Sequence, residues 1–167
     1  MRFAGAVVPR AVPDVYAHDP DSNGFAMEYI GDSDAYLWKT HLLAGQVGDE
    51  ARSVGAVLGR LHRASTRESF DVTPFANQQD FSALRLEPYL AFTAAVHPSA
   101  AGVLHDQIES LRSHDVALIH GDVSPKNLLI RAGTPVFLDA ECATMGDPAF
   151  DVAFCMNHLM LKAFHLP

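Results

Sequence analysis

Hydrophobic residues recur at helical spacing in one long segment, residues 49–65. Ala51, Val54, Leu58 and Leu61 are separated by three, four and three positions, which places them on one face of a helix. The segment starts with an aspartate, a residue that is typical of a helix N-terminus. The pattern therefore predicts an amphipathic helix with one buried face.

Two short apolar runs, 128–130 and 136–139, flank a loop that contains Gly133. This arrangement predicts a β-hairpin. A hairpin folded symmetrically about the glycine pairs residues 128 with 138 and 130 with 136, and it places Asn127 opposite Asp139. Because directly opposed residues have Cβ atoms about 4.5–5.5 Å apart on one face, we expect the amide and the carboxylate to converge.

The rest of the pattern predicts shorter elements. The expected elements are strands at 14–17 and 25–30, a break at 31–34, helices at 81–96 and 98–113, a loop at 140–145 and a short buried strand at 116–119. Pro88 is expected to bend the first of these helices. Asp147 and Pro148 predict the start of a final helix, which is apolar nearly all round and is therefore expected to be buried.

The segment 120–127 reads His-Gly-Asp-Val-Ser-Pro-Lys-Asn and carries the candidate chemistry. Asp122 precedes the hairpin on a tight loop, where its carboxylate would orient an attacking hydroxyl. Asn127 and Asp139 offer the hard oxygen ligands that suit Mg²⁺. One carboxylate beside the nucleophile and two residues on the metal are the apparatus of phosphoryl transfer. The alternative is that these residues only form turns or face solvent.

Residues His120–Asn127 and Asp139 resemble the catalytic and metal-binding segments of the aminoglycoside phosphotransferase and choline kinase family, small-molecule kinases with a protein-kinase-like fold. Residues 146–151 resemble the G-D-P-x-x-D element of that family. The resemblance is densest over 117–154 and extends more faintly back to Val12. It implies an α+β fold that is mainly the helical C-terminal lobe, with the catalytic hairpin and two remnant strands of the N-terminal lobe.

The resemblance also implies a nucleotide site. Met27, Glu28, Tyr29 and Ile30 correspond to the hinge of the family, where the backbone of an extended strand bonds the adenine edge. Residues 1–30 would then be the remnant of the N-terminal lobe with the hinge, and 31–167 the truncated C-terminal lobe. An ordinary amphipathic strand is the alternative interpretation of the hinge segment.

Further roles follow from the same resemblance. His120 would support the catalytic loop, and Lys126 lies close enough in that loop to meet a γ-phosphate. Asp151 would bond the backbone of the catalytic loop, with Asp147 beside it at the start of the last helix. Stabilisation of the helix dipole is an alternative role for Asp151, and the two roles are compatible. We expect His62 to be a packed, hydrogen-bonded histidine.

Composition narrows the classes of partner. The chain has 167 residues, of which 49% are hydrophobic and 19% charged, as in one ordinary globular domain. A net charge of −8 argues against nucleic acid or an anionic membrane as the main partner and is compatible with a cationic substrate. Cys142 and Cys155 form no metal-binding or disulfide pattern, which favours reduced thiols and a cytoplasmic location.

The chain departs from the family in what precedes the hinge. It has no glycine-rich phosphate loop, and its three lysines, Lys39, Lys126 and Lys162, all follow the hinge. Relatives also continue beyond the helix that ends this chain. We therefore expect a truncated or degenerate relative that alone has little or no kinase activity and whose exposed strand edges favour self-association.

Two functions of different classes follow. The first is an ATP- and Mg²⁺-dependent phosphotransferase that acts on a hydroxyl of a small molecule, such as an aminoglycoside-like compound or another amino alcohol or sugar. The second is a non-catalytic kinase-like module that binds a nucleotide or a partner. The joint presence of Asp122, Asn127 and Asp139 favours the enzyme, whereas the absent lysine favours the module. A metal-dependent phosphohydrolase is a third hypothesis.

Overall fold

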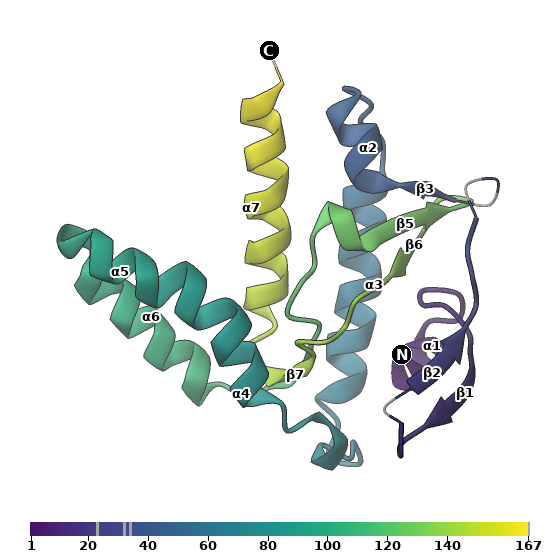
Figure 1. Ribbon diagram of the computed structural model, residues 1–167, viewed down its shortest axis with the longest axis horizontal. Helices are drawn as coiled ribbons and strands as arrows, with labels where there is room; N and C mark the ends of the chain where they lie inside the picture. Colours follow the sequence, from purple (N-terminus) through teal and green to yellow (C-terminus); the bar gives the residue numbers. More distant parts are fainter. Residues whose placement is uncertain (23, 32, 34, 167) are drawn as a thin grey trace. The chain divides into compact units, whose positions relative to one another are not determined.

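The computed structural model describes residues 1–22, 24–31, 33 and 35–166, and it combines helices with small antiparallel sheets (Figure 1). The helices are α1 (Arg2–Val7), α2 (Trp38–Leu43), α3 (Glu50–Ser65), α4 (Gln78–Phe81), α5 (Phe92–Val96), α6 (Ala101–Ser113) and α7 (Ala149–His165). A π-helix, η2 (Ser82–Ala91), joins α4 to α5, and 3-10 turns lie at η1 (Thr73–Phe75), η3 (Pro98–Ala100) and η4 (Pro125–Asn127). The strands are β1 (Val15–Asp19), β2 (Gly24–Met27), β3 (Tyr36–Leu37), β4 (Ala117–Ile119), β5 (Leu128–Arg131), β6 (Thr134–Phe137) and β7 (Thr144–Gly146). The predicted α+β class is confirmed.

The chain divides into two compact units. Unit 1 comprises Met1–Leu61, Val123–Asp139 and Phe154–Pro167, and unit 2 comprises His62–Asp122 and Ala140–Ala153. The boundary between Asp122 and Val123 falls inside the predicted catalytic segment. The predicted lobe boundary at residue 30 stays a prediction. The predicted break at 31–34 includes Asp32 and Asp34, which lie outside the described residues.

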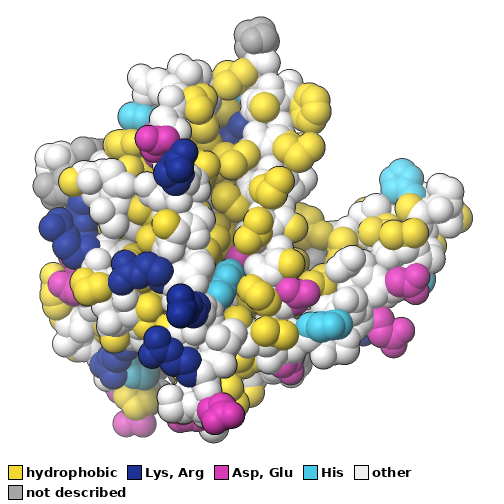
Figure 2. All heavy atoms as spheres, turned by 180° about the vertical axis from the view of Figure 1, so that it is seen from behind, with side chains coloured by type: hydrophobic (Ala, Val, Ile, Leu, Met, Phe, Trp, Pro, Cys, Tyr) yellow, Lys and Arg dark blue, Asp and Glu magenta, His cyan; other side chains and the backbone are white. Residues whose placement is uncertain are grey.

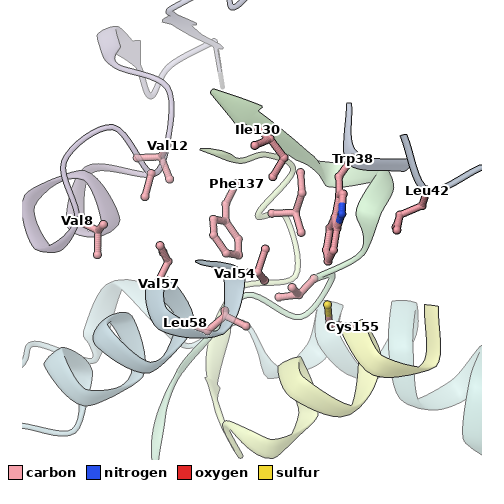
Figure 3. Packing of buried hydrophobic residues seen from close by; sticks show 13 residues of the cluster. Val8, Val12, Trp38, Leu42, Val54, Val57, Leu58, Ile130, Phe137 and Cys155 are labelled. Atoms are coloured by element: carbon pink, nitrogen blue, oxygen red, sulfur yellow. The ribbon is translucent and has the colours of Figure 1, made fainter. Parts of the chain in front are cut away.

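Unit 1 is built on the three-stranded sheet β3-β5-β6. Its core includes Val54 and Leu58 of α3, Trp38 of α2 and Phe137 of β6, whose side chains point toward one another in Figure 3. The helix predicted at 49–65 is therefore confirmed, with its buried face, although Ala51 in the first turn is exposed. The alternation of buried and half-buried positions along β5 is that of a strand with one packed face.

The predicted hairpin is confirmed, but its register is wrong by one residue. Leu128 pairs with Phe137 and Ile130 with Pro135. The turn consists of the two residues 132 and 133, which have φ values of 49° and 77°, and a two-residue turn with two positive φ angles is the type I′ turn that matches strand twist. The hairpin axis therefore lies half a residue before the predicted one.

The shift in register changes the neighbour of Asn127. Its carbonyl oxygen accepts a hydrogen bond of 2.9 Å from the Leu138 N–H, so Leu138, not Asp139, lies opposite it. The direct Asn127–Asp139 opposition was wrong, since a slip of one residue turns each side chain to the other face. Asp139 instead follows the end of β6 with a φ of 60°, in the left-handed region.

The β1–β2 hairpin carries the predicted hinge at its end. The two predicted strands are present and pair antiparallel, and their bounds differ from the expected ranges by one to three residues. Large apolar side chains are exposed here, with Tyr16 at 69%, Phe25 at 56% and Tyr29 at 91%. An isolated two-stranded sheet with exposed apolar side chains is marginal in water. Self-association through this segment stays a prediction.

Unit 2 packs helices around a short two-stranded sheet. Helices α5 and α6 lie side by side (Figure 1), and a cluster of buried residues forms the core. The cluster consists of Phe81, Leu86, Ile108, Leu111, Ile119 and Cys142. The helices predicted at 81–96 and 98–113 are confirmed, and the stretch that contains Pro88 is a π-helix.

Strand β7 was not predicted, because residues 140–145 were expected to form a loop. It pairs antiparallel with β4, so that Ala117 lies opposite Gly146 and Ile119 opposite Thr144. The Thr144 hydroxyl is buried, donates to the Phe75 carbonyl at 3.1 Å and accepts from the Asn77 N–H at 3.2 Å. Because its hydroxyl both donates and accepts a hydrogen bond, the buried Thr144 stabilises β7, a strand that the hydropathy pattern alone does not predict.

Helix α7 begins where Asp147 and Pro148 predict, but the expectation that it is buried all round is wrong. Cys155 packs in the unit 1 core, whereas Met156 and Met160 are each 56% exposed and Phe164 is 83% exposed. Figure 2 shows hydrophobic side chains exposed along the surface of α7. Among the described residues, no helix combines the length and the apolar character that a membrane span requires.

Candidate functional site

Asp122 lies at the end of a tightly held loop in unit 2. Asp122 is only 2% exposed. Gly121 before it has a φ of 77°, and a Cβ at that position would lie 2.8 Å from both the Cβ and the carbonyl oxygen of Cys142. Only glycine satisfies both the left-handed backbone and the close approach. The glycine of the His-Gly-Asp sequence is therefore required by geometry.

Asp151 anchors this loop from the first turn of α7. Its side chain is fully buried, and its two oxygens accept the backbone N–H groups of His120 and Gly121, each at 2.9 Å. His62 Nε2 contacts the same carboxylate at 2.9 Å. A buried carboxylate needs several such partners to offset its lost hydration. These are the backbone contacts that the resemblance implies for Asp151, and His62 is packed and hydrogen-bonded as expected.

His120 and Asp147 have local structural contacts. His120 Nδ1 accepts a hydrogen bond from the Asp122 N–H at 3.2 Å, which closes the turn before the aspartate. Asp147 Oδ1 accepts from the Ala149 N–H at 2.8 Å and so caps α7. Both contacts support the loop or the helix that carries Asp151. Their part in any reaction stays a prediction.

The contact of Arg85, in η2, with the catalytic segment was not predicted from the sequence. The side chain of Arg85 is 9% exposed, and its Nη2 lies 2.9 Å from Asp122 Oδ2. Its Nε donates to the Gly121 carbonyl at 2.7 Å, and its Nη1 donates to the Leu84 carbonyl at 2.8 Å. One signal was available. Arg85 lies four positions after Phe81 and so on the apolar side of the predicted helix, and an arginine in such a place indicates a buried ion pair, since arginine is almost never buried unless it is paired.

The predicted metal ligands belong to unit 1. Asn127 is 7% exposed and ends η4, where its N–H donates to the Ser124 carbonyl at 2.9 Å. Asp139 is exposed and has a left-handed backbone, a conformation that is costly outside glycine and often marks functional positions. Lys126, between Ser124 and Asn127, is exposed.

The chemistry of these donors fits Mg²⁺. Asn127 and Asp139 contribute an amide and a carboxylate, which are hard oxygen ligands. Among the residues that the structure describes, the buried Ser124 hydroxyl has no hydrogen-bond partner, so one more oxygen beside Asn127 remains to be satisfied. Within the described residues, no three His, Cys, Asp or Glu side chains gather around a common point. Mg²⁺ does not require such a group, since it usually keeps water and phosphate oxygens.

The predicted hinge lies beside the catalytic hairpin within unit 1. Glu28 forms an ion pair of 2.6 Å with Arg131 of β5, and its N–H donates to the Asp14 carbonyl at 2.8 Å. Tyr29 is exposed, while Ile30 is half-buried. Glu28 thus ties the segment 27–30 to the hairpin that follows Asn127.

Comparison with known proteins places these features in a family. The sequence profile of the phosphotransferase enzyme family (APH) matches residues 1–164. A methylthioribose kinase of Pectobacterium carotovorum is 24% identical over an alignment of 185 residues. The alignment includes 95% of this chain and 46% of that protein.

Solved structures agree on the fold. A choline/ethanolamine kinase family protein from Mesorhizobium loti superposes with a TM-score of 0.61 at 21% identity, covering 98% of this chain and 55% of that one. The choline kinase LicA from Streptococcus pneumoniae gives 0.58 at 18% identity over 93% of this chain and 55% of LicA, and LicA has also been solved in complex with AMP. The chain thus spans about half the length of these relatives.

Proposed function

Because the chain belongs to the phosphotransferase enzyme family, we propose that the whole protein transfers the γ-phosphoryl group of ATP to a hydroxyl of a small molecule. The observation that carries this proposal is the fixed loop that bears Asp122. Asp151 holds the Gly121 N–H and Arg85 holds the Gly121 carbonyl, so the backbone before the carboxylate is restrained from both ends. Phosphoryl transfer depends mostly on such positioning.

Each residue of the motif has a separate task in this proposal. Asp122 accepts a hydrogen bond from the acceptor hydroxyl, orients it toward the γ-phosphorus and takes its proton as the new O–P bond forms. Asn127 and Asp139 would hold Mg²⁺, which neutralises charge on the phosphate oxygens when it is bound. Lys126, which is exposed in the same short segment, would meet the γ-phosphate.

The hinge residues are proposed to bind the adenine ring. Backbone groups of Met27, Glu28, Tyr29 and Ile30 would bond its edge, with the exception of the Glu28 N–H, which donates to the Asp14 carbonyl. The Glu28–Arg131 ion pair would hold this segment at a fixed distance from the hairpin. The AMP complex of LicA, a relative in fold, supports a nucleotide site in proteins of this kind.

The acceptor is proposed to be an amino alcohol or a sugar. The relatives are named for methylthioribose, choline and ethanolamine, which are all small molecules that carry a hydroxyl. The net charge of −8 favours cationic members of this class through long-range attraction.

A non-catalytic kinase-like module is the second candidate. It is favoured by one observation, the burial of Asp122 in an ion pair with Arg85, which leaves the side chain of Asp122 only 3% exposed. We expect residues 1–167 alone to show little or no transfer, because they include no lysine before the hinge that could meet the phosphates.

The two candidates differ in their response to acceptors. Full-length protein is incubated with ATP, Mg²⁺ and single members of a panel of amino sugars, choline-like amines and pentose derivatives, and ADP release is followed. The enzyme requires ADP release that rises only with particular acceptors. Nucleotide binding without acceptor-dependent ADP release over the whole panel would favour the binding module.

The metal assignment has its own test. We expect Mn²⁺, in the presence of a non-hydrolysable ATP analogue, to broaden the side-chain resonances of Asn127 and Asp139, and to do so weakly without nucleotide, because two protein ligands leave most of the coordination to water and phosphate. Nuclear magnetic resonance of labelled full-length protein measures this. The exposed Asp106 of α6 is the reference signal. Broadening of Asp106 with Asn127 and Asp139 untouched would contradict the assignment.

A further inference from the structure

A single buried guanidinium contacts both the backbone and the side chain of the Gly121–Asp122 pair. Arg85 Nε donates to the Gly121 carbonyl at 2.7 Å, and Arg85 Nη2 lies 2.9 Å from Asp122 Oδ2. The guanidinium is planar and rigid, so these two contacts fix the carboxylate of Asp122 relative to the peptide before it. Backbone and carboxylate cannot turn independently while both contacts are made.

The opposite end of the same glycine is held by a second buried charge. The Gly121 N–H donates to Asp151 Oδ1 at 2.9 Å, and Asp151 also accepts the His120 N–H. The left-handed φ of 77° at Gly121 is the point about which the chain turns into Asp122. Asp151 therefore sets the loop, and Arg85 sets the direction of the side chain that leaves it.

The backbone around Arg85 is unusual in the same place. Arg85 lies in the π-helix η2, which runs from Ser82 to Ala91 and includes Pro88. A π-helix adds residues to each turn and changes the direction of its side chains, and such segments are frequent at functional sites. Phe81 and Leu86, five residues apart, both pack in the unit 2 core, which leaves Arg85 at the edge of that core.

We propose that Arg85 is a positioning residue that holds the carboxylate of Asp122 in the orientation required to align the acceptor hydroxyl. This inference rests on the proposed phosphotransferase function. The contacts to the Leu84 and Gly121 carbonyls act on the backbone of η2 and of the loop before Asp122. The third contact, to the side chain of Asp122, is the one that bears on the reaction, and a lysine, with one charged nitrogen, cannot reproduce the fork that reaches both acceptors.

The first measurement is kinetic. In the full-length protein, Arg85→Met is expected to lower kcat by about 10²-fold and Arg85→Lys by about tenfold, with little change in the KM for ATP, because misplacing a reacting group costs rate rather than nucleotide binding. The matched control is Arg112→Met: Arg112 is exposed on α6 and donates to the Ser82 hydroxyl at the start of the same π-helix. The control is expected to keep kcat unchanged.

The second measurement does not require activity. Hydrogen bonding to a carboxylate slows rotation of the guanidinium, so the Nη2 protons of Arg85 are expected to be resolved by nuclear magnetic resonance in the wild type and to be lost or shifted in Asp122→Asn. The Nε proton, which is bonded to Gly121, is expected to persist. If the protein transfers no phosphoryl group, this result still reports the pairing, so failure of the proposed function is distinguishable from failure of the inference.

Three results would overturn the role of Arg85. Wild-type kcat in Arg85→Met would do so, and so would an equal loss in the Arg112→Met control. Arg85 resonances that are identical in the wild type and in Asp122→Asn would show that the pair does not form in solution. A kcat that is strongly reduced in Arg85→Met and less reduced in Arg85→Lys supports the proposal.

Discussion

Replacement of Asp122 by asparagine is expected to lower kcat of the full-length protein by roughly 10²–10⁴-fold, the usual scale for a positioned acid–base group. Asparagine keeps the shape of the side chain but cannot take the proton of the acceptor. Affinity for Mg·ATP is expected to stay nearly unchanged, because Asp122 acts on the acceptor. Asp139→Asn is expected to weaken Mg·ATP binding as well, since it removes a charged metal ligand.

The two variants are compared by steady-state kinetics and by calorimetric titration with Mg·ATP. Asp106→Asn, an exposed change on α6, controls for the loss of one negative charge. Because Asp122 is buried against Arg85, thermal unfolding of each variant is recorded to separate lost activity from lost structure. Equal effects of Asp122→Asn and Asp139→Asn on binding alone would contradict the separate roles.

The second large effect is on stability. Gly121→Ala is expected to lower the free energy of unfolding by about 1–3 kcal/mol from the left-handed backbone and by about another 1–3 kcal/mol from overpacking. The overpacking arises because the new Cβ would lie 2.8 Å from the carbonyl oxygen of Cys142, which is backbone and cannot rotate away. Denaturant unfolding measures the sum.

Gly133→Ala provides the matched control. Gly133 has the same φ of 77°, but no atom lies within 4 Å of the position of its Cβ. Its substitution is therefore expected to show the backbone cost without the packing cost. Equal losses in the two variants would mean that the loop at Gly121 relaxes freely, which would contradict the tight loop described for Asp122.

Local pattern predicted the main elements of this chain. The α3 helix, the β5–β6 hairpin and the start of α7 follow directly from apolar spacing and from the Asp-Pro pair. The hairpin register did not, because the turn places Ala132 at a positive φ, which a non-glycine residue seldom adopts. Sequence favours a loop centred on Gly133, whereas the observed turn is centred between Ala132 and Gly133.

The functional motif was easier to locate than its supports. Asp122 and Asp151 lie in recognisable sequence patterns, and the carboxylate of Asp151 meets the loop as the pattern implies. Arg85 lies 37 positions before Asp122, in a π-helix that the apolar pattern does not predict, so no sequence signal indicated that the two residues meet. Exposure of α7 was also missed, because its sequence is apolar on the faces that pack and on those that do not.

The most direct test of phosphoryl transfer is to follow the γ-phosphorus of ATP by ³¹P nuclear magnetic resonance in the full-length protein with Mg²⁺ and an acceptor that stimulates ADP release. The account predicts that the signal moves to a phosphomonoester of the acceptor, and that Asp122→Asn slows this change by the factor given above. Appearance of the phosphorus only as inorganic phosphate, or transfer that is unaffected by Asp122→Asn, would contradict it.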